Sequence, residues 1–98
     1  MHILTVLYGH PDDPAAFESH YADTHAPLVD RIGGLRSWSS RLIDSMDGST
    51  PPYHRIAELS FDSLDQLQAS MGSAEGRAAA EDVPNFASGG ATMMIAHD

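Results

Sequence analysis

The chain has 98 residues, of which 5 are basic and 14 acidic, so its formal net charge is −9. This acidic balance repels nucleic acid and anionic membrane surfaces, and we expect neither as a partner. Because cysteine is absent, the chain has no disulfide framework, thiol nucleophile or thiolate metal site. The length suits one domain over residues 1–98 with one hydrophobic core.

An apolar segment over residues 2–8 is rich in β-branched and aromatic side chains and predicts a strand. The segment is too short for a membrane span, and it lacks the basic flank of a signal peptide. The turn signal Gly9-His10-Pro11 ends it. We therefore expect a cytoplasmic protein.

The next segment predicts a helix, because Asp13 occupies an N-cap position and Pro14 follows at the first helical position. Pro27 removes a backbone donor from this helix, which predicts a kink or short break near residues 24–26. Side chains at three- and four-residue intervals define one helix face before the glycine pair at 33–34: Phe17, Tyr21, Thr24, Leu28 and Ile32.

The second half of the chain supplies the remaining elements. Asp62 or Ser63 caps a second helix, and Gln66 follows Ser63 by three residues as in a capping box. Apolar runs and turn residues predict strands at 35–43, 53–61 and 91–97, a hairpin loop at 44–52, a further helical turn or two at 73–82, and a docking loop at 83–86.

The resulting order β-α-β-β-α-β predicts an α+β, ferredoxin-like domain, in which a four-stranded antiparallel sheet carries both helices on one face. The first strand is apolar on both alternating sets, with Ile3 and Leu7 opposite Leu4, Val6 and Tyr8. Such a strand predicts a cover for the second sheet face. A second copy packed sheet to sheet would give a homodimer, a dimeric α/β barrel. A monomer with a ligand under the sheet is the alternative.

His25 is the leading candidate for chemistry, since it faces inward on the first helix and shares a face with Tyr21, four residues earlier. An imidazole is well matched to proton transfer near neutral pH, so we predict a catalytic His25 with Tyr21 orienting it or the substrate. The alternative is a half-buried His25 that bonds backbone carbonyls freed by Pro27, including that of Asp23.

His20 lies on the opposite margin of the apolar face in a regular helix. It is five residues from His25, which places the two imidazoles about 140° apart, unlike the i, i+4 pairs of helical zinc sites. We therefore predict no metal site. The glycine pairs 33–34 and 89–90 lack the spacing of phosphate-binding loops, so we predict no cofactor either.

Five further residues are predicted to contact a substrate: Trp38, His20, His54, Glu58 and Met94. On the third strand we assign Ala57, Leu59 and Phe61 to the helix side, and His54 with Glu58 to the other side. Glu58 is then either a solvated group or a carboxylate beneath a pocket with a raised pKa. Trp38 and Met94 would form an apolar pocket wall, although ordinary core packing is the alternative for both.

Several segments together resemble the EthD family in order and spacing: residues 3–8, 17–21, 24–28 with its H-x-P-L element, 56–63 with its F-D-S junction, and 82–86. The resemblance implies a dimeric ferredoxin-like barrel with a pocket between helices and sheet. It also implies an association with degradation of ethyl tert-butyl ether beside a haem monooxygenase system, and an oxidoreductase label that no cofactor motif here supports. In the family pattern a histidine often stands at the position of Glu58.

Three functions remain open. The first is a cofactor-independent enzyme that isomerises, cyclises or dehydrates a small apolar metabolite through His25. The second is a non-catalytic accessory protein that binds or shuttles a hydrophobic metabolite for a neighbouring haem oxygenase. The third is a structural dimer without a ligand.

Overall fold

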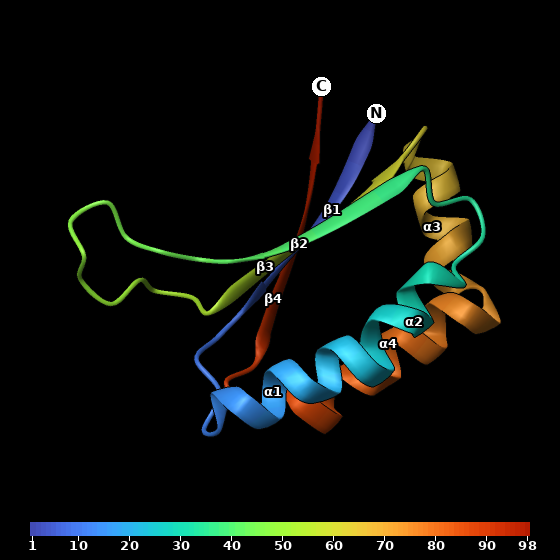
Figure 1. The fold of residues 1–98 in the computed structure, drawn as a ribbon. Coiled ribbons are helices and arrows are strands. Elements are labelled where there is room, and N and C mark those ends of the chain that lie inside the picture. Colours follow the sequence, from blue (N-terminus) through green and yellow to red (C-terminus); the bar gives the residue numbers. More distant parts are fainter.

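The computed structural model describes residues 1–98 and contains a four-stranded antiparallel sheet with all helices on one face (Figure 1). Strand β1 pairs with β3 on one side and β4 on the other, and the sheet order is β2-β3-β1-β4. The strands are β1 (His2–Tyr8), β2 (Ser37–Leu42), β3 (Arg55–Phe61) and β4 (Ala91–His97). This arrangement confirms the predicted ferredoxin-like α+β fold.

The helical layer consists of one long bent helix and a second pair of helices. The bent helix contains α1 (Pro14–His20), a π-helical turn η1 (Tyr21–His25) and α2 (Ala26–Asp30). The pair is α3 (Leu64–Gly72) and α4 (Ala74–Phe86), and α4 runs alongside the bent helix in Figure 1. None of these helices combines the length and apolar character needed to cross a bilayer.

Both predicted caps are present, and each fixes the start of a helix. The Asp13 carboxylate accepts the backbone N–H of Ala16, and the Ser63 hydroxyl accepts that of Gln66. These bonds satisfy N–H groups that a helix end would otherwise leave unpaired.

The π-helical turn lies where Pro27 predicted a break. Pro27 has no N–H to donate, and just before it the Ala26 N–H bonds the Tyr21 carbonyl five residues back. The extra residue in this turn shifts the buried face of the helix. Thr24 is exposed, contrary to the prediction, whereas His25 and Val29 are buried.

The core lies between the sheet and the helices. The inward side chains of the two central strands are buried: Leu4, Val6 and Tyr8 on β1, and Ala57, Leu59 and Phe61 on β3. The predicted inward face of the third strand is therefore confirmed for these three residues. No element of the chain covers the other sheet face, as Figure 1 shows.

The predicted docking loop at 83–86 is wrong, because α4 continues through Pro84 to Phe86. Phe86 is buried among aromatic rings, with centroids 5.1 Å from Phe17 and 5.6 Å from Tyr21. Packing of this ring outweighs the one hydrogen bond that Pro84 removes from the helix. As a result, α4 presents an unbroken face to the bent helix.

Candidate functional site

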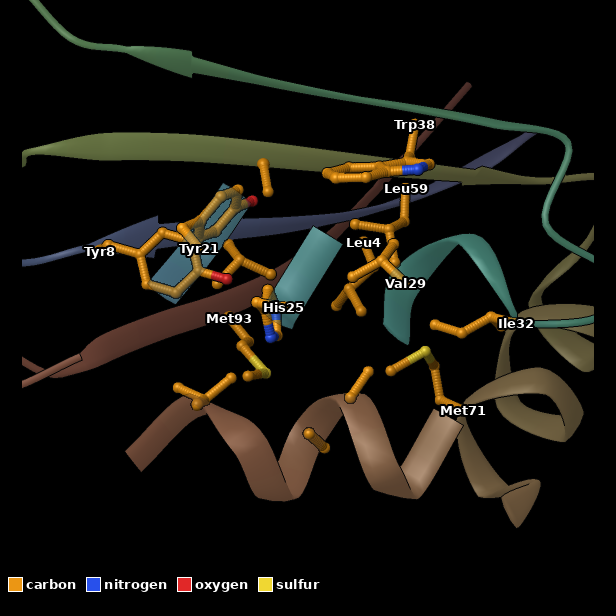
Figure 2. A pocket seen from close by; sticks show the side chains of 15 residues that line it. Leu4, Tyr8, Tyr21, His25, Val29, Ile32, Trp38, Leu59, Met71 and Met93 are labelled. Atoms are coloured by element: carbon orange, nitrogen blue, oxygen red, sulfur yellow. The ribbon is translucent and has the colours of Figure 1, made fainter. Parts of the chain in front are cut away.

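A largely apolar cavity, partly open to solvent, lies between the helices and the sheet, and the centre of a water-sized sphere can occupy about 30 Å³ of it. Side chains from all four strands, the bent helix, α3 and α4 line it (Figure 2). Tyr8, Tyr21 and His25 gather at one end in Figure 2, and Ile32 and Met71 lie at the other. The few polar groups of the cavity are therefore concentrated at one end.

His25 reaches the cavity from the π-helical turn, and only 4% of it is exposed. Its ring packs on Tyr21 and Phe86, with centroids 5.2 and 4.7 Å away. Its Nδ1 lies 3.0 Å from Oδ2 of Asp82. Because an ionised carboxylate can only accept, Nδ1 carries the proton and Nε2 is left bare. Nε2 makes no hydrogen bond within the chain, and the ring lines the cavity.

This geometry bears on the alternative in which His25 bonds backbone carbonyls freed by Pro27. The partner of Nδ1 is a carboxylate from α4, and not a backbone carbonyl freed by Pro27. A carboxylate fixes the orientation of an imidazole and stabilises the imidazolium that forms when the ring takes a proton. The contact is therefore of the kind found behind histidines that act as general bases.

Asp82 is a functional candidate that the sequence prediction missed. It lies on α4 with 7% exposure, and it also accepts hydrogen bonds from His20 at 2.9 Å and from the Asn85 amide at 3.2 Å. Burial alone would raise the pKa of this carboxyl, but the bonds from His20, Asn85 and His25 outweigh burial and hold the pKa below its usual range. Asp82 is therefore ionised at neutral pH.

His20 and His25 were predicted on opposite margins of the apolar face, but both imidazoles bond to Asp82. The prediction assumed a regular α-helix. In the π-helical turn, hydrogen bonds span five residues, which brings positions five apart toward the same face. His20 is 29% exposed and does not line the cavity. It instead contacts the solvent side of the Asp82 carboxylate.

The surroundings of His25 favour its neutral form. Burial lowers the pKa of His25 below its ordinary value of 6.5, the hydrogen bond and charge of Asp82 oppose this in part, and nearby His20 adds to the lowering. The imidazole is consequently uncharged at neutral pH, with Nε2 able to accept a proton.

Two phenols complete the polar end of the cavity. Tyr21 is 5% exposed, and its hydroxyl is buried without a hydrogen-bond partner in the chain. The ring of Tyr8 meets that of Tyr21 edge to face at 5.7 Å. The Arg55 guanidinium lies 5.0 Å from the centroid of the Tyr21 ring. Tyr21 is thus fixed by packing, and its hydroxyl makes no hydrogen bond of good geometry to the Ser40 and Tyr8 hydroxyls near it.

Trp38 lines the cavity, and its indole N–H donates to the Asp30 carboxylate at 2.8 Å. Met94 does not line it. In the register of the sheet Met93 pairs with Val6 and faces the helices, whereas Met94 pairs with Thr5 and lies on the uncovered face, 49% exposed. The cavity methionine of β4 is therefore Met93.

His54 and Glu58 are not brought together. Glu58 lies on the uncovered sheet face opposite Thr5 and Ser39, which agrees with the predicted side. His54 precedes β3 and does not follow the strand alternation, so its assignment to that side is wrong: Nε2 lies 3.0 Å from the Glu18 carboxylate of α1. Neither residue lines the cavity.

Glu18 pairs with Arg55 as well as His54, and these three residues form a charged cluster beside the helical layer. No group of three or more His, Asp or Glu side chains is arranged to hold a metal ion.

The EthD domain family model matches residues 10–90 of the chain. A relative from Rhodococcus erythropolis, described as an uncharacterized 11.0 kDa protein in the thcB-thcC intergenic region, is 43% identical over 95 residues, which cover 97% of this chain and 92% of the relative. The chain therefore belongs to the EthD family.

Solved structures agree with this assignment. An ethyl tert-butyl ether d (EthD) family protein from Bacillus halodurans has a TM-score of 0.93 and 36% identity, with 100% of this chain and 98% of that chain covered. An EthD-like protein from Ralstonia eutropha has a TM-score of 0.74 and 20% identity, covering 98% and 89%. A dimeric protein of ferredoxin-like fold from Bacteroides fragilis shares the fold at a TM-score of 0.71 and 15% identity, covering 99% and 95%.

Proposed function

We propose that this chain is a cofactor-independent enzyme that moves a proton on a small, largely apolar metabolite, with His25 as the general base and acid. One observation carries the proposal: the Nδ1 of His25 is held by Asp82, and the bare Nε2 belongs to a ring that lines an apolar cavity. Asp82 acts as a positioning residue, because it fixes the tautomer from behind the ring.

The surroundings of His25 suit proton transfer in both directions. When Nε2 takes a proton, the charge of the imidazolium is balanced by the buried carboxylate of Asp82 at 3.0 Å. The neutral ring is restored when Nε2 returns the proton to another atom of the bound molecule. General acid and base catalysis of this kind contributes about 10²–10⁴-fold to a rate. Isomerisation, cyclisation and dehydration all need such a step.

A second copy of the chain is proposed to cover the free sheet face. That face carries apolar side chains on three strands, among them Leu7, Ile56 and Met94. Met93, the neighbour of Met94 on β4, faces the helices and therefore lies outside this interface. Two fold neighbours described as dimeric ferredoxin-like proteins support this homodimer.

The wider setting rests on the family resemblance. We propose a cytoplasmic enzyme, and ether degradation beside a haem oxygenase system is the pathway that the resemblance implies. A carrier that delivers a hydrophobic metabolite to such an oxygenase would need the cavity but not the Asp82-held imidazole. The role of His25 therefore separates the enzyme from the accessory protein.

The test compares the wild-type protein with His25→Gln in a cell extract followed by untargeted mass spectrometry. We expect the wild type to deplete one metabolite and form a product of equal or dehydrated mass, while His25→Gln binds the same metabolite without converting it. His97→Gln, which changes an exposed histidine at the end of β4, is the matched control. A metabolite that both proteins bind and neither converts would establish the accessory role instead.

A further inference from the structure

The hydroxyl of Tyr21 is the most unusual polar atom of the cavity. It is buried and has no hydrogen-bond partner in the chain, although buried hydroxyls are nearly always paired. Tyr21 lines the cavity beside His25, and their ring centroids lie 5.2 Å apart. The two rings lie side by side on the cavity wall, so a bound molecule of modest size can contact both side chains at once.

The chemistry of the two phenols defines the matching ligand atom. Burial raises the pKa of Tyr8, and the neighbouring Tyr21 phenol raises it further. Burial also raises the pKa of Tyr21, and the nearby Ser40 hydroxyl, the Arg55 charge and the Tyr8 phenol oppose the rise only in part. The Ser40 and Tyr8 hydroxyls approach the Tyr21 hydroxyl without reaching hydrogen-bond geometry. Both phenols thus keep their protons at neutral pH and can donate hydrogen bonds. The ligand atom that meets them is a hydrogen-bond acceptor, such as an oxygen.

The cavity offers no partner for a charged ligand. Arg55 is the cation nearest Tyr21, but its guanidinium bonds Glu18 and Ser40 and does not line the cavity. An anion buried without a partner is strongly unfavourable. The ligand that fits this cavity is therefore neutral and apolar apart from its acceptor oxygen.

We propose that the substrate is a neutral carbonyl compound with an acidic hydrogen on the carbon next to the carbonyl. The free hydroxyl of Tyr21 donates to the carbonyl oxygen, and Nε2 of His25 takes the neighbouring hydrogen. This substrate class rests on the proposed function of His25. An ether offers an acceptor oxygen but no hydrogen acidified by a carbonyl, so an ether does not meet both requirements.

The step balances within the cavity. The C–H bond breaks, its proton forms the Nε2–H bond of His25, and its electron pair becomes the new carbon–carbon double bond. The carbonyl π electrons move to the oxygen, and the Tyr21 O–H stabilises the resulting enolate. The proton then returns to carbon or oxygen, which regenerates His25. No electrons enter or leave, so no oxidant or reductant is required.

The test uses two probes of the same shape, acetophenone and its hydrocarbon isostere α-methylstyrene, titrated by NMR into the wild type, Tyr21→Phe and Tyr53→Phe. Tyr53 lies outside the cavity and serves as the control. We expect the wild type and Tyr53→Phe to prefer the ketone by about tenfold, the ratio that one hydrogen bond supplies. Tyr21→Phe should bind both probes equally. Circular dichroism checks that each variant is folded. Tyr8→Phe, which removes the other phenol hydroxyl of the cavity, is titrated in the same way.

Equal affinities for the two probes in the wild type, failure of the ketone to bind, or a preference that survives in Tyr21→Phe would overturn the substrate class. A separate experiment follows the exchange of the methyl hydrogens of acetophenone for deuterium in D₂O. Exchange by the wild type but not by His25→Gln supports the base. If the preference holds and exchange is absent, the proposed function fails while the binding preference stands. If exchange occurs without the preference, the proposed substrate class fails while the proposed function of His25 stands.

Discussion

His25 and Asp82 are 57 positions apart in the sequence, yet Nδ1 of one lies 3.0 Å from Oδ2 of the other. The contact joins the π-helical turn of the bent helix to α4. It fixes the imidazole at the wall of the cavity and gives a buried carboxylate one of its three side-chain donors. The same contact therefore serves the stability of the helical layer and the chemistry of the site.

Replacing Asp82 with alanine should destabilise the fold. The change leaves the imidazoles of His20 and His25 and the Asn85 amide without their shared acceptor, and a buried unpaired group costs about 1–3 kcal/mol. We expect the free energy of unfolding in urea to fall by about 2–3 kcal/mol. Glu81→Ala, at an exposed neighbouring position, should change it by less than about 0.5 kcal/mol. Equal losses in both variants would contradict the role given to Asp82.

The free energy of unfolding should decrease as the pH falls, because His25 takes up a proton more readily in the unfolded chain than in the folded one. The folded-state pKa of His25 lies below the unfolded value of 6.5, so the unfolded chain binds this proton first as the pH drops. The contribution of neutral His25 to the free energy of unfolding is complete above about pH 6.5. It is lost as the pH falls toward the folded-state pKa of His25. Asp82, whose pKa is lowered from 3.8, adds a second loss at more acidic pH.

Denaturant unfolding at a series of pH values measures this dependence. Between pH 7 and 5 the slope for the wild type should exceed that for His25→Gln, by up to about 1.4 kcal/mol per pH unit. Superimposable curves for the two proteins would show that His25 titrates alike in the folded and unfolded states.

Tyr21→Phe should raise the stability of the protein while impairing its function. The variant keeps the packed ring but removes a buried hydroxyl that has no partner. Removing an unpaired buried polar atom is expected to stabilise the fold by about 1 kcal/mol, or about 4–8 °C in Tm for a domain of this size. Thermal unfolding followed by circular dichroism measures the change. A clear fall in Tm would show that the hydroxyl is paired within the folded chain.

Met94→Glu should disrupt the proposed homodimer. Met94 lies on the uncovered sheet face with 49% exposure, and a carboxylate there would be buried against the second copy. Sedimentation at micromolar concentration should show a dimer for the wild type and a shift toward the 10.5 kDa monomer for Met94→Glu. Met46→Glu, at a fully exposed loop position, should stay dimeric. A wild-type protein that sediments only as a monomer would rule out the dimer.

Much of the fold could be predicted from local patterns. Asp13 with Pro14 and Ser63 with Gln66 marked the helix starts, and the β-branched strand β1 was located with its correct bounds. The inward orientation of His25 was also predicted, and the ring is more deeply buried than the half-buried alternative assumed. These features depend on short-range chemistry, which a single sequence displays directly.

The rest of the site depends on contacts that local patterns do not contain. The convergence of His20 on His25 requires a π-helical turn, and the choice of Met93 over Met94 requires the register of β4. Asp82 was missed because Pro84 suggested that α4 ended before it reached Phe86. One signal was present: Asp82 lies on an apolar face with Ala79, Val83 and Phe86 at helical spacing, where a carboxylate needs a partner.

In the proposed mechanism, His25 offers a bare Nε2 to the cavity because Asp82 holds its Nδ1–H. Long-range ¹H–¹⁵N NMR of the histidine side chains at pH 7 tests this most directly, because the ¹⁵N shifts report which ring nitrogen carries the proton. We predict a neutral His25 with Nδ1 protonated and Nε2 unprotonated, and a loss of this single tautomer in Asp82→Ala. A wild-type His25 that is protonated on Nε2, or doubly protonated at this pH, would contradict the account.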